Sequence, residues 1–195
     1  MRLFWKWLLA LGLLVILGCS DSADTPTEDT SSGRLDIAEL EMRAETGDPA
    51  AEYALGMMYE TGDGVAIDSS RARQWIRKSA DQGYAPAQYE LGRFYTLKGP
   101  QQDFSKAVDW LRRAAEQKYL HAQTSLGMLY AAGQGVEQDF AKAYAWLSLA
   151  ANSGSESATK AKQQLLQVIT EEELNLGLNL TDRFRRGLYG ADDEP

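Results

Sequence analysis

The sequence predicts an all-α protein, an α/α solenoid of three tandem repeats with capping helices at both ends. Two observations predict this class. A segment of 35 to 36 residues recurs three times along the chain, and in every copy the apolar residues follow the 3.6-residue period of a helix. Repeat periods of about 20 to 50 residues are typical of solenoids, in which each unit buries its apolar face against its neighbours.

Composition narrows the classes of function. The 195 residues include 20 Lys and Arg against 28 Asp and Glu, a net charge of −8, which argues against a nucleic-acid partner because nucleic-acid binding depends on basic side chains. A single Cys excludes an internal disulfide framework and a multi-cysteine metal site. A single His excludes a histidine-cluster zinc site. We therefore expect no nucleic-acid partner, no metal and no cofactor.

Residues 1–18 are predicted to be a lipoprotein signal peptide. Two basic residues, Arg2 and Lys6, precede an apolar run over residues 8–17, which is the pattern of a secretory signal. This run is shorter than the ~20 residues that a membrane-spanning helix needs. It ends in Ile16-Leu17-Gly18-Cys19, which resembles the bacterial lipoprotein cleavage box, although Ile16 stands where that box usually has Leu. The resemblance implies a diacylglyceryl group on the Cys19 thiol. The alternative is an incidental thiol in an ordinary signal or anchor.

Residues 19–33 are predicted to be a disordered acidic tether. Residues 20–33 include four acidic side chains, no basic one and no large apolar one, so this segment cannot bury enough surface to offset the entropy of ordering. With the lipid on Cys19, the tether would hold the rest of the chain off a membrane. Ser20 directly after Cys19 resembles the sorting pattern for the outer membrane, facing the periplasm. An inner-membrane location stays open because Asp21 is close.

The first predicted helix covers residues 34–47 and caps the N-terminal end. Its Leu40 and Ala44 repeat the spacing of the second helix of a repeat. The repeats themselves are predicted at residues 48–83, 84–118 and 119–154. The first helix of each repeat carries the pattern Leu-Gly-x-x-Tyr: Leu55, Gly56 and Tyr59; Leu91, Gly92 and Tyr95; Leu126, Gly127 and Tyr130.

The second helix of each repeat is marked by a tryptophan, namely Trp75, Trp110 and Trp146. Each Trp follows an Asp by seven residues, and these Asp residues stand where a side-chain oxygen can cap a helix: Asp68, Asp103 and Asp139. Glycine-containing loops precede them, in which Gly can supply a positive φ: Gly62-Asp-Gly64-Val, Lys98-Gly99-Pro100 and Gly133-Gln-Gly135-Val.

A glycine inside each first helix costs about 1 kcal/mol relative to Ala, so its recurrence indicates a compensating gain. The residues are Gly56, Gly92 and Gly127. We expect the two helices of a repeat to approach closely there, with the flat Trp of the second helix as the facing surface.

These motifs together are similar to the Sel-one-like repeat family, α/α solenoids related to the tetratricopeptide class. The second copy departs from the family because Lys98-Gly99-Pro100 replaces Gly-x-Gly-Val. A tetratricopeptide unit has Trp three residues before its Leu-Gly, where this chain has Glu52, Gln88 and Gln123. The resemblance implies a right-handed superhelix whose first helices line a concave groove, and a role in binding other proteins.

The C-terminal residues 155–186 are predicted to form further capping helices, with Thr170 and Glu173 as a capping box between them. The third repeat has apolar side chains, Ala145 and Leu149 among them, on a face that carries charged residues such as Lys78 in the first repeat. We therefore expect the C-terminal helices to cover Leu149. Residues 187–195 are predicted to be a flexible tail.

A stripe along the first helices, opposite their core positions, is the candidate partner-binding surface. It contains Tyr53, Met57, Tyr89, Arg93 and Met128, and aromatic residues, Met and Arg are enriched in protein interfaces. The two tyrosines have a second interpretation, that they only pack adjacent first helices together. Met57, Arg93 and Met128 are not consensus residues of the family, so they are the better candidates.

No pattern for catalysis is present. His121, the single His, has no nucleophile or ligand-spaced partner, and the glycine loops lack the preceding strand and the Lys of a phosphate-binding loop. We therefore expect no enzyme but a scaffold that binds envelope proteins. The alternatives are a purely structural spacer, or a modulator of a peptidoglycan enzyme or a weak β-lactam-interacting protein. The family members with β-lactam activity carry a Cys pair in every repeat, which this chain lacks.

Overall fold

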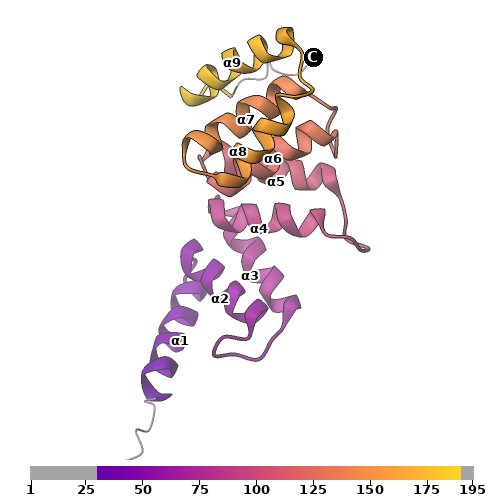
Figure 1. Cartoon of the computed structure of the whole chain (residues 1–195). Helices are drawn as coiled ribbons and strands as arrows, with labels where there is room; N and C mark the ends of the chain where they lie inside the picture. Colours follow the sequence, from indigo (N-terminus) through magenta and orange to yellow (C-terminus); the bar gives the residue numbers. More distant parts are fainter. Residues whose placement is uncertain (1–29, 190–195) are drawn as a thin grey trace, which may run out of the picture. The chain divides into compact units, whose positions relative to one another are not determined.

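The computed structural model describes residues 30–189, and every regular element in this range is an α-helix (Figure 1). The predicted signal peptide, Cys19 and the tether up to residue 29 lie outside the described residues, as do residues 190–195. The helices are α1 (Thr30–Glu45), α2 (Pro49–Thr61), α3 (Ser69–Asp81), α4 (Ala85–Thr96), α5 (Phe104–Glu116), α6 (Leu120–Ala132), α7 (Phe140–Asn152), α8 (Glu156–Leu165) and α9 (Glu171–Arg185).

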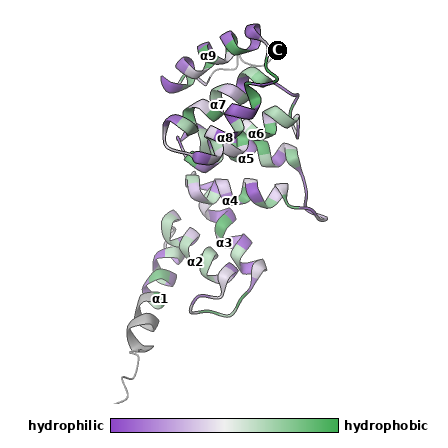
Figure 2. Cartoon of the chain, viewed as in Figure 1, coloured by the Kyte–Doolittle hydropathy of each residue, from purple (hydrophilic) through white to green (hydrophobic). Residues whose placement is uncertain are grey.

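The predicted repeats are helix pairs in the structure. Within a repeat, α2 packs on α3, α4 on α5 and α6 on α7; between repeats, α3 packs on α4 and α5 on α6. Apolar residues occupy these contacts and polar residues the outer faces (Figure 2). Leu55, Leu111, Leu126 and Leu147 are all at most 2% exposed. The all-α repeat fold is therefore confirmed, with its core running from one helix pair into the next.

The three second helices begin as predicted. The Asp68 carboxylate accepts from the backbone N–H groups of Ser70 and Arg71, both at 3.0 Å. The carboxylates of Asp103 and Asp139 each accept from the N–H three residues later, at 3.0 and 2.8 Å. The same Asp residues also close the loops, because each donates its backbone N–H to the carbonyl of the repeat's Tyr59, Tyr95 or Tyr130, at 2.9, 2.9 and 3.0 Å. The unusual loop of the second copy therefore ends like the other two.

The glycines of the first helices lie at the predicted close approach, but the expected partner is wrong. An ideal Cβ on Gly92 would stand 2.6 Å from Cγ of Leu111, and the corresponding distances are 2.7 Å from Gly56 to Cγ1 of Ile76 and 2.8 Å from Gly127 to Cγ of Leu147. The facing residue is thus the one after each Trp, which lies about 100° further around the helix. Trp110 instead packs in a cluster with Ile76 and Leu91, across the boundary between two repeats.

The N-terminal helix begins earlier than predicted. Helix α1 starts at Thr30, so the last four residues of the predicted tether, 30–33, are helical. The polar composition correctly indicates that this segment has little to bury, but a helix anchored further along gains a backbone hydrogen bond for each residue added. The anchor is the predicted one, because Ala44 is fully buried and Leu40 packs on the same cluster.

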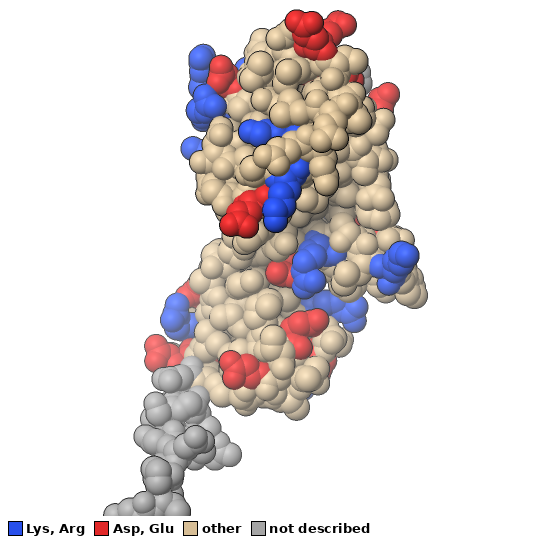
Figure 3. All heavy atoms as spheres, viewed as in Figure 1, with Lys and Arg blue, Asp and Glu red and all other residues tan. Residues whose placement is uncertain are grey.

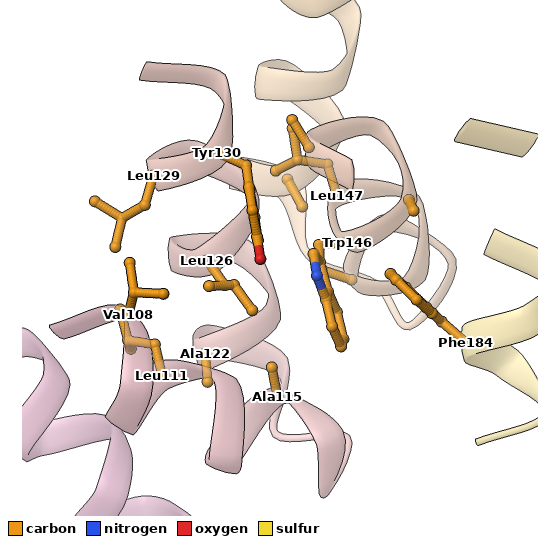
Figure 4. Packing of buried hydrophobic residues seen from close by; sticks show 14 of the residues in the cluster. Val108, Leu111, Ala115, Ala122, Leu126, Leu129, Tyr130, Trp146, Leu147 and Phe184 are labelled. Carbon is orange, nitrogen blue, oxygen red and sulfur yellow. The ribbon is translucent and has the colours of Figure 1, made fainter. Parts of the chain in front are cut away.

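The C-terminal helices cover the third repeat as predicted. Helix α9 packs on α7, where Leu149 is half-buried and Ala145 fully buried, whereas 47% of the Lys78 side chain is exposed. The rings of Trp146 and Phe184 lie 4.7 Å apart between the two helices (Figure 4). The capping box of Thr170 and Glu173 is present at the start of α9.

The prediction of a flexible tail from residue 187 is wrong for its first residues. Tyr189 stacks on Trp146, with ring centroids 5.5 Å apart and planes 11° from parallel. The acidic composition of the last residues gave no sign of this contact, in which a single aromatic ring packs on the core while Gly187 and Leu188 stay exposed.

The close approach predicts the effect of Gly92→Ala. The added methyl group collides with Leu111, and overpacking of this kind costs about 1–3 kcal/mol, more than the ~1 kcal/mol of helix propensity that Ala gains. We expect a net loss of unfolding free energy, measured by chemical denaturation. In a Leu111→Ala background, which makes room for the methyl group, the same change should cost less. A stabilisation in the native background would contradict the packing described here.

Candidate protein-binding surface

The structure divides the predicted stripe into two sets, of which the first contacts the next repeat. Tyr53 of α2 packs on Tyr84, the residue that precedes α4, with ring centroids 5.5 Å apart. Tyr89 of α4 packs in the same way on Tyr119, which precedes α6, at 5.4 Å. The rings of these two tyrosines therefore pack between adjacent repeats.

The third copy makes the equivalent contact with hydroxyl groups. Thr124 stands where Tyr53 and Tyr89 stand in their helices, and its Oγ1 lies 3.2 Å from Oγ of Ser155, which caps α8. Burial, with the nearby Glu90 carboxylate, raises the pKa of Tyr53 to about 12. Burial also raises the pKa of Tyr119. The phenols of Tyr53 and Tyr119 are thus neutral over the whole physiological range.

The second set of stripe residues is more accessible. Arg93 is on α4 with 49% of its side chain exposed, and its Nε donates to Oε2 of Glu90 at 2.8 Å. That hydrogen bond raises the pKa of the Arg93 guanidinium. Met128 on α6 is 42% exposed. Met57 is half-buried and packs against the cluster of Ile76 and Leu91. Arg93 and Met128 are therefore the stripe residues that a partner could reach most easily.

Cations on aromatic rings form a second repeating feature, which the sequence analysis missed. Arg71, Lys106 and Lys142 occupy one position of the three repeats, and each lies 5.6 to 5.8 Å from the ring centre of its own repeat's Tyr59, Tyr95 or Tyr130. Each also pairs with the Asp that caps its helix, at 3.4, 2.9 and 3.6 Å. The Asp therefore begins the helix and also places a cation over the ring.

A further arginine reaches the same tyrosines from the preceding repeat. Nη1 of Arg77 donates to the Tyr95 hydroxyl at 3.4 Å, and Nη2 of Arg112 donates to the Tyr130 hydroxyl at 3.0 Å. The guanidinium of Arg77 also lies 5.7 Å from the ring centre of Trp110. Arg77 and Arg112 are 35 residues apart at the same place in their repeats, so aligning the charged residues as well as the apolar ones would have revealed the pair.

The position of the tetratricopeptide Trp holds buried polar side chains that bond to neighbouring helices. Glu52 is fully buried, and its carboxylate takes Nζ of Lys78 at 2.8 Å and a hydrogen bond from the Gln82 amide. Gln88 and Gln123 each donate from Nε2 to a carbonyl at the end of the preceding repeat, at 3.3 and 3.2 Å. Buried polar groups of this kind fix the register of packed helices, since a shift would leave them unpaired.

The remaining candidates for chemistry lie apart from one another. His121 is exposed and packs against the rings of Tyr89 and Tyr119, at 5.8 and 5.7 Å. Among residues 37–189, whose side chains the structure describes, there is no group of three or more His, Cys, Asp and Glu that could hold a metal. In the same range no helix is both long and apolar enough to cross a membrane. Acidic and basic side chains are both scattered over the surface in view (Figure 3).

The repeats match a known family. The family model of the Sel1 repeat matches residues 49–84, 85–119 and 120–155, one residue later than the predicted boundaries. The chain belongs to the Sel1 repeat family. A putative sel1-like repeat-containing protein of Acanthamoeba polyphaga mimivirus is 39% identical over 59 residues, which are 30% of this chain and 11% of that protein.

Two crystal structures show the same fold. A Sel1 repeat protein from Oxalobacter formigenes is 35% identical with a TM-score of 0.63, over 66% of this chain and 98% of that one. A protective antigen of uropathogenic Escherichia coli strains, which displays an SLR fold, is 31% identical with a TM-score of 0.64, over 77% of this chain and 33% of that one. This family and fold indicate a protein-interaction scaffold.

Proposed function

We propose that this Sel1 repeat protein is a lipid-anchored scaffold of the bacterial cell envelope that binds an envelope protein along its first helices. The main support for the proposal is that the stripe contains two kinds of residue, those that pack between repeats and those that are exposed. The tyrosines are engaged between repeats, while Arg93 and Met128 lie exposed on the first helices of consecutive repeats. The stack thus presents two accessible side chains on neighbouring first helices.

The chemistry of these side chains suits a protein partner. Arg and Met are enriched at the centres of protein interfaces, and the flexible thioether of Met adapts to irregular surfaces. Glu90 holds the Arg93 guanidinium in one orientation through a 2.8 Å hydrogen bond, so less side-chain entropy is lost when a partner binds. The chain carries a net charge of −8, and Arg93 gives this stripe an exposed positive charge.

The membrane anchor is the lipid proposed for Cys19. The only Cys of the chain stands where the lipoprotein box requires it, and each buried CH₂ of an acyl chain contributes about 0.8 kcal/mol to membrane binding. Two or three chains would therefore hold the protein stably. Ser20 supports the outer membrane, facing the periplasm, as its location.

Replacing Cys19 tests the anchor. Cys19→Ser should abolish labelling by a metabolic fatty-acid probe and leave an unprocessed or soluble species, because the thiol that accepts the lipid is gone. The measurement is probe incorporation and membrane fractionation in the native bacterium, with Ser22→Ala as a matched control that should label normally. Undiminished labelling of Cys19→Ser would disprove the anchor.

Changing the exposed pair tests the partner surface. Arg93→Glu combined with Met128→Asp should weaken capture of envelope proteins by about 30-fold or more, the loss typical of a binding hot spot. Helicity and thermal midpoint should stay nearly unchanged, because both side chains are largely exposed. The control combines Lys160→Glu with Leu178→Asp, which makes similar charge changes at exposed positions of α8 and α9. Full capture by the first double variant would move the binding site off the stripe.

A further inference from the structure

A hollow of about 310 Å³ lies between α1, α2 and α3, at the N-terminal end of the repeats. Its walls include two carboxylates of α1, Glu41 and Glu45, and two aromatic residues, Tyr59 of α2 and Trp75 of α3. Carboxylates beside aromatic rings form an environment that favours a cation, since both the negative charges and the ring faces attract it. The equivalent sites in the later repeats show which cation fits this environment.

The corresponding place in the next unit of the stack is filled by Arg77. This guanidinium lies 3.5 Å from the Asp81 carboxylate one turn later, donates to the Tyr95 hydroxyl at 3.4 Å and lies 5.7 Å from the ring centre of Trp110. One repeat further, Arg112 reaches the Tyr130 hydroxyl at 3.0 Å. In both units an arginine from the preceding helix fills the space beside the tyrosine.

Helix α1 has the same packing positions but not the arginine. Leu40 and Ala44 occupy the places of Ile76 and Ala80, and both dock on the first repeat. In this register Glu41 stands in the place of Arg77 and Glu45 in the place of Asp81.

Counterparts of all three partners of Arg77 therefore line the hollow, namely Glu45, Tyr59 and Trp75. The guanidinium that would join them is replaced by a carboxylate. The hollow thus lacks the arginine that the preceding helix supplies to the two later units, and α1 places a carboxylate there instead.

We propose that this hollow binds the arginine side chain of a protein partner. The inference rests on the proposed protein-binding function but concerns a different surface from the stripe. A guanidinium suits the site better than an ammonium because it is planar, can stack on an aromatic ring and can donate to a carboxylate and a hydroxyl at once. Glu41 adds a second carboxylate that the internal sites lack, which provides attraction for a charge that arrives from outside.

Two cations of the first repeat already contact residues of the hollow, but both pair with carboxylates other than Glu41 and Glu45. Lys78 lies 5.0 Å from the Trp75 ring centre and pairs with Glu52. Arg71 lines the hollow: its guanidinium lies 5.6 Å from the Tyr59 ring centre, donates to the Tyr59 hydroxyl at 3.4 Å and pairs with Asp68 at 3.4 Å. The Tyr59 oxygen has a second lone pair that can accept from another donor. The equivalent of Arg71 in the second repeat, Lys106, lies 5.6 Å from the Tyr95 ring that Arg77 also reaches, so the two cations are compatible. Met42 follows Glu41 and is 58% exposed, which supplies apolar surface for the residues that flank the incoming arginine.

The test titrates the full chain in detergent solution with a blocked Ala-Arg-Ala peptide. The signal is the indole N–H of Trp75 in a spectrum of ¹⁵N-tryptophan-labelled protein. We expect a saturable shift of Trp75 but not of Trp110, whose site is already filled, and a response at least about tenfold weaker to the isosteric citrulline peptide. Equal responses to the two peptides would overturn the proposal. So would the absence of a shift at about 10 mM peptide, where millimolar dissociation constants are still detected.

Glu41→Arg is the decisive variant. The introduced guanidinium should fill the hollow from within, abolish the response of Trp75 to the peptide and raise the thermal midpoint by about 2–4 °C. The matched control is Glu39→Arg, which makes the same charge change at an exposed position of α1 and should keep binding within about twofold, since exposed charges are screened. Equal losses in the two variants would show a general charge effect and no site.

Two further outcomes distinguish this proposal from binding at the stripe and from self-association of the chain. The stripe variant Arg93→Glu with Met128→Asp should still bind the peptide, so a failure of the hollow and a failure of the stripe are distinguishable. A shift of Trp75 that depends on protein concentration, without peptide, would assign the hollow to a second copy of the chain and contradict an arginine from another protein.

Discussion

The structure depends on the close approach of two helices at one glycine in each repeat. At Gly56, Gly92 and Gly127 a side-chain carbon would stand within 2.8 Å of the facing Ile or Leu side chain. Each glycine costs about 1 kcal/mol of helix propensity, which the packing of the second helix against bare backbone offsets. Because the distance between the paired helices is set there, the side chains further along the helices meet at fixed places in all three repeats.

Contacts between repeats use polar groups and aromatic rings in addition to aliphatic side chains. Tyr53 and Tyr89 pack on the tyrosine before the next first helix, and Arg77 and Arg112 reach tyrosines of the next repeat. Such contacts are directional, so they specify one stacking register where aliphatic contacts alone would tolerate several. The two ends of the stack differ in consequence. The C-terminal end is covered by α9 with aromatic packing around Trp146, whereas α1 covers the other end without the arginine and leaves a hollow.

Much of this fold could be predicted from the sequence because each position of the repeat occurs three times and the copies can be compared. The helix pairs, the capping Asp residues and the cover over Leu149 follow from spacing and polarity. The partner of Gly92 could not be predicted, because periodicity places Trp110 and Leu111 on one apolar face and does not say which meets the glycine. The start of α1 and the stacking of Tyr189 were missed for a related reason. The composition of a segment indicates how much apolar surface it can bury by itself, but not which neighbouring helix or ring it packs against. The exposed pair on the stripe was chosen from the sequence, whereas the hollow depends on a contact network that only the structure shows.

The most direct test of an interaction scaffold is site-specific photocrosslinking in the native envelope. A benzoylphenylalanine would be introduced at position 128 on the stripe and, in a separate strain, at position 178, which is similarly exposed on α9. A scaffold that binds along its first helices predicts one dominant protein adduct at position 128 that is absent at 178 and is lost when Arg93 is also changed to Glu. No adduct at position 128, or the same adducts at both positions, would contradict binding along the first helices.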